Sequence, residues 1–446
     1  MESRRPAPGP KPHFLFGNLI EFGRDVLGFF SSSASQYGDV VSLRLGRAPG
    51  CLINHPALFE YVLLTNNRNF IKHTFFWKHV TDIFGKGLVT NEGASWLRQR
   101  RLAQPAFHRD RIAGYGETMV SYTERMLEDW RAGQTIDLHH EMMELTMQIV
   151  SRTLFGVDIE GDTAREVGAA FDDALEVVDA RFRRPVKIPE FLPLPGNIRY
   201  RRAVRKLDHL VYRFIEARRR DPGDDLLSML MAARDEDDGS AMDDRQLRDE
   251  AVTIFLAGHE TTALVLCWTL YLLATHPDEE AKLAAELRNI LGERTPSVSD
   301  LPQLKWMTHV VEESMRLYPP AYAFGREALN DCEIGGYHIE KGTTVFLSPW
   351  VIHRDARFFE DPAEFRPQRW ENDFAKRLPR FAYLPFGGGP RICIGNSFAM
   401  MEATLLLSTI LQRFKLTLVP GQRIEPHPSI TLRPRYGMHM TLHARS

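Results

Sequence analysis

The sequence predicts a mainly helical protein with a small β-region, because two kinds of pattern divide the chain. Helical periodicity dominates residues 115–154 and 245–275. The second of these stretches would form a helix of roughly 45 Å, long enough to cross a whole domain. Apolar residues that alternate or cluster between glycines at 39–55, 322–347 and 415–442 predict short strands.

From the N-terminus, the first predicted elements are a hairpin at 39–55 and a helix that Pro56 opens and that runs through Thr65. Helical patterns follow at 93–107, at 115–154 with a break at Gly133, and at 163–182. A proline-rich connection leads to a basic helix that begins near Arg199. Its charge run predicts a solvated helix face.

The acidic stretch 234–244 predicts an exposed loop before the longest helix, which ends at Pro277 because proline cannot continue it. Two more helices are expected at 278–291 and 301–317, and Pro319 with Pro320 stops the second. A β-region at 322–347, a helix at 400–414 and short strands at 415–442 complete the chain. We find no internal repeat.

Composition excludes a strongly charged binding function. The chain has 446 residues, with 56 Lys and Arg against 58 Asp and Glu, so no global attraction to nucleic acid or to a membrane surface is expected. Its four cysteines have no close spacing. They predict reduced thiols in a cytosolic protein rather than a zinc site or a disulfide framework.

Residues 1–37 form a polar, proline-rich lead-in that has no signal-peptide core and no membrane anchor. The best apolar run, 262–275, is shorter than the ~20 residues that a membrane span requires. Because the motifs described below are spread along the chain, we expect residues 1–446 to form one domain. No G-x-G-x-x-G follows a predicted strand, so no nicotinamide or flavin domain is expected.

The stretch Pro385–Gly395, PFGGGPRICIG, organises the chain. A lone cysteine is usually a small buried hydrophobe, but the neighbours of Cys393 are set by backbone geometry. The three glycines at 387–389 let the backbone turn where side chains would clash, and Pro390 stiffens the turn. A helix follows, and its positive end should favour a thiolate at Cys393.

Two further motifs suggest a cofactor that carries carboxylates and a reaction that needs an acid. Trp96 and Arg100 are four residues apart, so an indole N–H and a guanidinium share one helical face and could grip a carboxylate. The sequence AGHETT interrupts the longest helix with Gly258 and polar residues. Thr261 or Thr262 could bond back to the carbonyl four residues earlier, which favours either a packing kink or an acid–alcohol notch.

The cysteine stretch resembles the cysteine-loop signature of the cytochrome P-450 superfamily, the haem-thiolate monooxygenases, at five positions: Phe386, Gly389, Arg391, Cys393 and Gly395. The resemblance makes Cys393 the axial thiolate ligand of a haem b iron. It assigns Trp96, Arg100, Ala257, Arg326, Phe386 and Arg391 to haem binding. It also implies a structural network of Glu313, Arg316 and Arg369.

The family's fold would be a triangular prism with the haem between the longest helix and the helix after Cys393. The resemblance implies oxygen binding at Ala257–Gly258, with Thr261 orienting the donor or a water and Glu260 relaying protons. Electrons would come indirectly from NAD(P)H, through a separate ferredoxin or flavodoxin and its reductase. Arg98 and Arg101 are candidates for that docking surface. We expect a monomeric, cytoplasmic protein of the soluble bacterial type.

The resemblance also locates the substrate pocket, which should accept a lipophilic substrate of the terpenoid, carotenoid or fatty-acyl type. The expected contacts are Phe75, Phe76, Trp77, Phe255, Tyr322, Phe324 and Ile430. Oxygen would enter a C–H or C=C bond.

Three alternatives stay open. The same fold could catalyse desaturation, dehydration or isomerisation, although such members often lose the threonine that is present here as Thr261. A haem sensor or carrier would need the cysteine loop without the acid–alcohol pair. A structural protein with a buried free cysteine would bind no haem.

Overall fold

A computed structural model of the chain describes residues 6–72, 74, 84–158, 168, 170, 173–174, 176–177, 180, 192–235 and 239–445. The helices at the two ends of the chain and around the centre are α1 (Leu19–Arg24), α2 (Val26–Tyr37), α3 (Pro56–Glu60), α5 (Gly93–Ala103), α6 (Arg109–Gly114), α7 (Gly116–Glu128), α8 (Leu138–Phe155), α10 (Pro195–Arg220), α11 (Leu226–Ala232), α12 (Asp244–Thr275), α13 (Pro277–Leu291), α14 (Lys305–Leu317), α15 (Pro349–Ile352), α16 (Phe374–Arg377) and α17 (Asn396–Arg413).

Short strands form small sheets and hairpins. Their bounds are β1 (Val40–Leu45), β2 (Ala48–Ile53), β3 (Phe70–Ile71), β4 (Thr135–Asp137), β5 (Phe324–Ala328), β6 (Cys332–Ile334), β7 (Tyr337–Ile339), β8 (Thr344–Leu347), β9 (Phe414–Leu418), β10 (Pro426–Pro428), β11 (Leu432–Pro434) and β12 (His439–Ala444). The mainly helical prediction with a small β-region is therefore confirmed.

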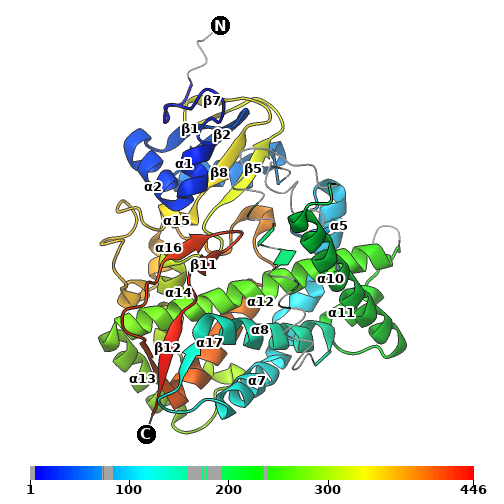
Figure 1. Ribbon diagram of the computed structural model, residues 1–446, viewed down its shortest axis with the longest axis vertical. Helices are drawn as coiled ribbons and strands as arrows, with labels where there is room; N and C mark the ends of the chain where they lie inside the picture. Colours follow the sequence, from blue (N-terminus) through cyan, green and yellow to red (C-terminus); the bar gives the residue numbers. More distant parts are fainter. Residues whose placement is uncertain are drawn as a thin grey trace.

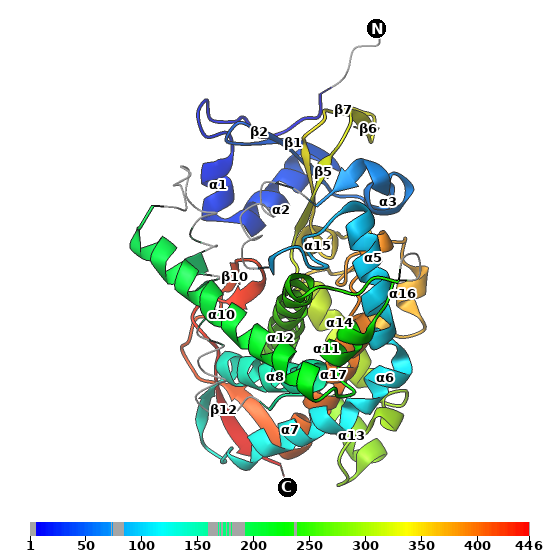
Figure 2. The same ribbon diagram turned by 90° about the vertical axis from the view of Figure 1, so that its right-hand side faces the viewer.

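Helix α12 is the axis of the helical region. Asp243 caps its start by accepting a hydrogen bond from the backbone of Gln246, and Pro277 follows its end. Figure 2 shows α12 almost end-on, with α8, α10, α11, α14 and α17 around it. By length and composition it is the one helix in the described ranges that matches a membrane span. Most of its apolar stretch is buried inside the protein, as in a core helix.

The larger sheet has the strand order β1-β2-β8-β5-β3, with β2 and β8 parallel and the other neighbours antiparallel. In Figure 1 this sheet and α1–α2 lie at one end of the molecule, above α12, while β12 lies near the C-terminus at the other end. The hairpin β10–β11 lies between these regions, beside the middle of α12. The middle of α12 and the hairpin β10–β11, which are far apart in the sequence, thus lie close together near the centre of the molecule.

Two details differ from the sequence predictions, and a third prediction lies mostly outside the described residues. The lead-in at 1–37 contains α1 and α2, and the buried side chains of α2 pack against β1 and β2. The stretch 115–154 is not helical throughout, because after Gly133 the chain forms β4, which pairs with β12. Most of the predicted helix at 163–182 lies outside the described residues.

Candidate active site

The cysteine loop leads from the larger sheet's end of the molecule into α17. Its turn at Gly389–Arg391 places Gly389 at φ +67°, where a Cβ atom would lie 1.9 Å from the carbonyl oxygen of Leu63. Only glycine fits this position. The loop is closed by a hydrogen bond of 3.0 Å from the Cys393 backbone N–H to the Phe386 carbonyl. The geometry holds the Cys393 side chain just before the first turn of α17.

The Cys393 thiol is accessible, yet the surrounding protein desolvates its sulfur. Burial raises the pKa of the thiol above its ordinary value, and it outweighs the lowering effects of the Gly395 backbone N–H and of the charges on Arg100 and Lys72. Without a bound iron, burial thus opposes the thiolate that the following helix is expected to favour at Cys393. A coordinated metal ion deprotonates such a thiol outright.

The middle of α12 forms a notch. Ala257 is exposed within an otherwise buried run of the helix, and it lines a cavity together with Thr261. The Thr261 hydroxyl donates to the Ala257 carbonyl at 2.6 Å, and Thr262 donates to the Gly258 carbonyl at 3.2 Å. Both predicted back-bonds are present.

Gly258 has a different role from Ala257. A Cβ atom at Gly258 would lie 3.2 Å from Val150 of α8, so this glycine lets the two helices pack closely. Gly258 thus serves close helix packing, while the adjacent Ala257 faces the cavity.

Glu260 is 3% exposed and lies one residue before Thr261. Its Oε1 accepts a hydrogen bond of 2.6 Å from the Thr431 hydroxyl and a second one from the Arg433 guanidinium. Burial alone would raise the pKa of Glu260. The charge and hydrogen bond of Arg433, with the bond from Thr431, instead hold it below its ordinary value. Glu260 is consequently a buried carboxylate at neutral pH.

A second buried acid, Glu402 of α17, lies beside the hydroxyl of Thr262. No guanidinium lies among the groups that shift it, and burial raises its pKa to about 8. The two acids therefore differ in charge at neutral pH. Sequence reasoning identified Glu260 by its motif, whereas Glu402 sits in an ordinary apolar helix pattern that gave no signal.

Four cationic side chains gather near the cysteine loop, and one carboxylate lies among them. Arg391 donates to the carbonyl of Asn91 and pairs with Glu92, and its guanidinium lies 3.8 Å from the centre of the Trp96 ring. Burial and repulsion from Arg391 lower the pKa of Arg326 to about 10. Burial, with repulsion from Arg326 and Arg391, lowers the pKa of Lys72 well below its ordinary value.

The fourth cation is Arg100, which lies one turn beyond Trp96 on α5 and donates to the Ile392 carbonyl at 3.1 Å. Arg100 also lies close to Cys393, because its charge lowers the pKa of the thiol and Cys393 in turn raises the pKa of Arg100. A desolvated surplus of positive charge of this kind matches a ligand that carries carboxylates. Sequence reasoning missed Lys72, because a single lysine after a strand has no motif.

The predicted structural network is fully formed. Glu313 and Arg316 are completely buried and joined by two hydrogen bonds of 2.8 Å, and Glu313 also accepts from Arg369 at 3.2 Å and from Trp370 at 2.9 Å. Arg316 uses its remaining donors on the carbonyls of His353, Pro362 and Glu364. Because every partner is satisfied, the network is rigid.

His353 connects this network to the cysteine loop. Its backbone carbonyl accepts from Arg316 at 2.8 Å, while its ring Nε2 accepts from the Leu384 backbone N–H at 3.0 Å. Leu384 immediately precedes the loop, which begins at Pro385. The ring must stay neutral to accept, and burial together with the charge of Arg316 lowers its pKa well below the ordinary value.

A cavity of about 940 Å³ adjoins the notch. Of the predicted substrate contacts, Tyr322, Phe324 and Ile430 line it. Phe255 does not: it is 3% exposed and packs against Phe155 in the core between α8 and α12. The remaining three, Phe75, Phe76 and Trp77, lie outside the described residues.

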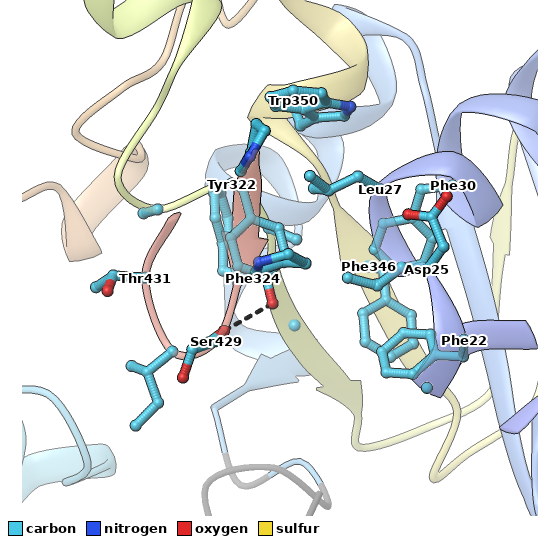
Figure 3. A pocket seen from close by; sticks show the side chains of 18 of the residues that line it. Phe22, Asp25, Leu27, Phe30, Tyr322, Phe324, Phe346, Trp350, Ser429 and Thr431 are labelled. Carbon is cyan, nitrogen blue, oxygen red and sulfur yellow. Dashed lines mark hydrogen bonds between the residues drawn. The ribbon is translucent and has the colours of Figure 1, made fainter. Parts of the chain in front are cut away.

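Figure 3 shows a group of cavity-lining side chains that sequence reasoning missed. They are contributed by α1, α2, β8 and α15: Phe22, Leu27, Phe30, Phe346 and Trp350. The sequence shows that these residues are apolar, but it does not show that α2 packs on the larger sheet. Tyr322 stands between this group and the turn at 429–431, where its hydroxyl donates to the Ser429 carbonyl at 2.8 Å.

The suggested docking arginines on α5 have other partners. Arg98 forms an ion pair of 3.1 Å with Asp235 and donates to the Ser240 hydroxyl at 2.7 Å, so it anchors the segment before α12. Arg101 also lies near Asp235, at 3.7 Å, with a side chain that is 44% exposed. Arg98 is therefore unsuited to a docking role.

The whole fold has a close counterpart among solved structures. The structure described as "Crystal structure of cytochrome P450DA heme domain" matches it with a TM-score of 0.90 and 27% sequence identity, over 99% of this chain and 98% of that one. Fold and cysteine loop together define a haem-thiolate protein. A family model for Cytochrome P450 matches residues 7–440, and the chain belongs to this family.

Curated relatives cover nearly the whole chain as well. Cyclooctatin synthase of Streptomyces melanosporofaciens is 39% identical over 96% of this chain and 93% of that protein. Cyclooctat-9-en-7-ol 5-monooxygenase of the same organism is 38% identical, over 93% of this chain and 90% of that protein. Pentalenene oxygenase of Streptomyces avermitilis is 36% identical, over 99% and 97% respectively.

The protein is accordingly a monooxygenase that uses haem iron, O2 and electrons from redox partners, and it acts on lipophilic substrates. Two features of this chain fit the cofactor. The cationic surplus around Arg326 and Arg391 provides partners for its acidic groups, and Cys393 provides an accessible sulfur ligand.

Proposed function

We propose that the protein inserts one oxygen atom into a C–H or C=C bond of a cyclic terpenoid. The relatives named for cyclooctatin, cyclooctat-9-en-7-ol and pentalenene are terpenoid-modifying monooxygenases. Their similarity to this chain is the reason for choosing terpenoids among the lipophilic classes. The observation that carries the proposal is the cavity between α12 and the β-region. Carotenoid and fatty-acyl substrates are the competing classes.

The cavity suits a bulky apolar molecule. Its volume of about 940 Å³ is at the upper end of the range of roughly 300–1,000 Å³ that is typical of small-molecule sites. Aromatic and aliphatic side chains form most of its wall, and the wall reaches Ala257 and Thr261 of α12. Its rigid aromatic groups come from short helices and strands that are anchored in the core, so they favour a compact ring system over a flexible chain.

Cys393 would bind the haem iron through its sulfur, and the acidic groups of the haem would be held by Arg100, Arg326, Arg391 and Lys72, with the Trp96 ring against Arg391. Once bound there, the haem supplies the activation of O2. The protein's own part is positioning and proton supply. Ala257 leaves space at the notch and Thr261 presents a hydroxyl to the cavity. Glu260 contributes its carboxylate next to Thr261.

We further propose that residues 1–446 form a single catalytic domain, monomeric and cytoplasmic. It would receive electrons that originate from NAD(P)H through a separate ferredoxin or flavodoxin with its reductase. The exposed guanidinium of Arg101 is the remaining candidate on α5 for that contact.

The substrate class is tested by optical titration of the purified haem protein with a panel of terpenes, carotenoids and fatty acids. Displacement of water from the iron by a fitting ligand shifts the haem absorption spectrum. We expect the largest shift with polycyclic terpenes, and turnover of the same compounds with surrogate redox partners. Saturable shifts with fatty acids alone would contradict the terpenoid assignment and leave the monooxygenase class intact.

Replacing Thr261 with alanine should leave haem binding unchanged but release more hydrogen peroxide per NAD(P)H consumed. The variant lacks the hydroxyl beside Ala257, and a general acid or base positioned by such a group typically contributes 10²–10⁴-fold to rate, on the order of several kcal/mol. Peroxide and product are measured together in the same reaction.

Thr275→Ala is the matched control, because Thr275 makes the same type of back-bond on α12, to the Tyr271 carbonyl, at the far end of the helix. It should behave like the unmodified protein. An unchanged ratio of product to NAD(P)H in Thr261→Ala would refute the role given to Thr261.

A further inference from the structure

The hairpin β10–β11 contacts two parts of the site at once. Its turn, residues 429–431, lines the cavity. Its second strand carries Arg433, and the turn ends at Thr431, so both polar partners of Glu260 belong to this one hairpin. One hairpin therefore supplies both a part of the cavity wall and the two polar partners of Glu260, the distal acid.

Leu432, the residue directly after the turn, is fixed to its surroundings. The Leu432 carbonyl accepts from the Trp268 indole of α12 at 2.8 Å, and its N–H donates to the Pro320 carbonyl at 3.0 Å. The turn itself is joined to the rest of the cavity wall by the hydrogen bond from Tyr322 to Ser429. A ligand in the cavity would therefore contact the segment that ends in Thr431.

The ion pair is nearly buried, with 4% of the Glu260 side chain and 20% of the Arg433 side chain exposed. Desolvating a carboxylate is costly unless a cation and hydrogen bonds compensate, and here Arg433 and Thr431 provide both. The groups that act on Glu260 are Arg433 and Thr431 from the hairpin and His259 from its own helix. Among the residues that the structure describes, Arg433 is the guanidinium that acts on Glu260.

We propose that Arg433 is the positioning residue of the distal acid. Through Arg433 and Thr431 the β10–β11 hairpin fixes the side chain of Glu260, so that the fit of a ligand against residues 429–431 sets how Glu260 is presented to the notch. The inference rests on the proposed proton-supplying role of Glu260. Arg433 itself touches neither substrate nor cofactor in this scheme.

The ion pair is tested by thermal unfolding of the haem-bound protein between about pH 5 and about pH 8. With Arg433 present, the pKa of Glu260 lies below its unfolded value, so the pair stabilises the fold throughout this window and loses its effect only at lower pH. In Arg433→Gln, burial would raise that pKa above the unfolded value, and stability should then fall as pH rises. We expect a loss in Tm that is several degrees larger at the upper pH.

The double variant Glu260→Gln/Arg433→Gln should lack this pH trend, because the buried carboxylate is gone. Arg433→Lys should retain most of the stability. Arg423→Gln is the matched control, since Arg423 pairs with Glu425 just before the same hairpin and its side chain is 74% exposed. A pH-independent loss in Arg433→Gln, equal with and without Glu260, would overturn the inference by making Arg433 a packing residue.

The link to chemistry is tested with the terpene that gives the largest spectral shift. Arg433→Gln should raise peroxide release per NAD(P)H several-fold, and Arg433→Lys should restore coupling. If Glu260→Gln raises peroxide release and Arg433→Gln does not, the inference about Arg433 is wrong and the proposed role of Glu260 stands. If Glu260→Gln itself changes nothing, the proposed role of Glu260 is wrong, while the unfolding result still decides whether the ion pair fixes its side chain.

Discussion

Cys393→Ser should abolish the thiolate-type spectrum of the reduced carbon monoxide complex and all monooxygenase activity. A serine hydroxyl would occupy the same place in the loop, but it is a poor ligand for haem iron. It donates far less electron density than a thiolate, and it is the electron donation of the thiolate that favours O–O cleavage. The loop should keep its shape, since the Cys393 backbone bond to Phe386 does not involve the sulfur. The measurement is the difference spectrum after reduction under carbon monoxide.

Cys332→Ser makes the same atomic change at a partly buried thiol of β6 and should leave the spectrum intact. The variants should have similar circular dichroism, which separates loss of the ligand from loss of the fold. A normal carbon monoxide spectrum in Cys393→Ser would remove Cys393 as the iron ligand and, with it, the assignment of the loop as the proximal site.

Glu313→Gln should cost about 3–5 kcal/mol of unfolding free energy, the typical penalty for leaving a buried charge without its partner. The amide cannot accept all five hydrogen bonds that now reach the carboxylate, and the buried guanidinium of Arg316 would lose its counter-charge. Because Arg316 also holds the His353 carbonyl, the start of the cysteine loop should loosen and haem should be lost more easily. Chemical unfolding and haem-transfer rates measure the two effects.

Glu312→Gln is the adjacent control. Its side chain is partly buried and forms no ion pair with the residues that the structure describes. Burial raises its pKa to about 7, so removing the acid should be nearly neutral for stability. Equal losses in the two variants would show that helix α14 is disturbed in general. The predicted difference follows only from the Glu313 network.

The sequence was informative wherever a short motif implies a geometry. The cysteine loop, the AGHETT interruption of α12 and the Glu313–Arg316 pair each lie within a few residues or on one helix, so spacing alone brings their members together. The longest helix was placed within one residue of its observed start at Asp244. The mainly helical class followed from the same local patterns.

Contacts between distant segments could not be predicted in this way. Arg433 meets Glu260 across 173 positions of sequence, and nothing in a basic residue on a short strand indicates which acid it pairs with. Lys72 and α2 were missed for the same reason, because tertiary packing rather than local pattern assigns their partners. Phe255 was misplaced since an aromatic residue next to a notch can face either side of a buried helix.

The surplus of cations around Lys72, Arg326 and Arg391 has a consequence for biosynthesis. Glu92 compensates only part of this charge, and the remaining repulsion acts in a region that water barely reaches, so the haem-free chain should be the less stable species. A ligand that binds only the folded chain stabilises it in proportion to its supply. The yield of intact protein in a producing cell should therefore rise with the haem available during synthesis.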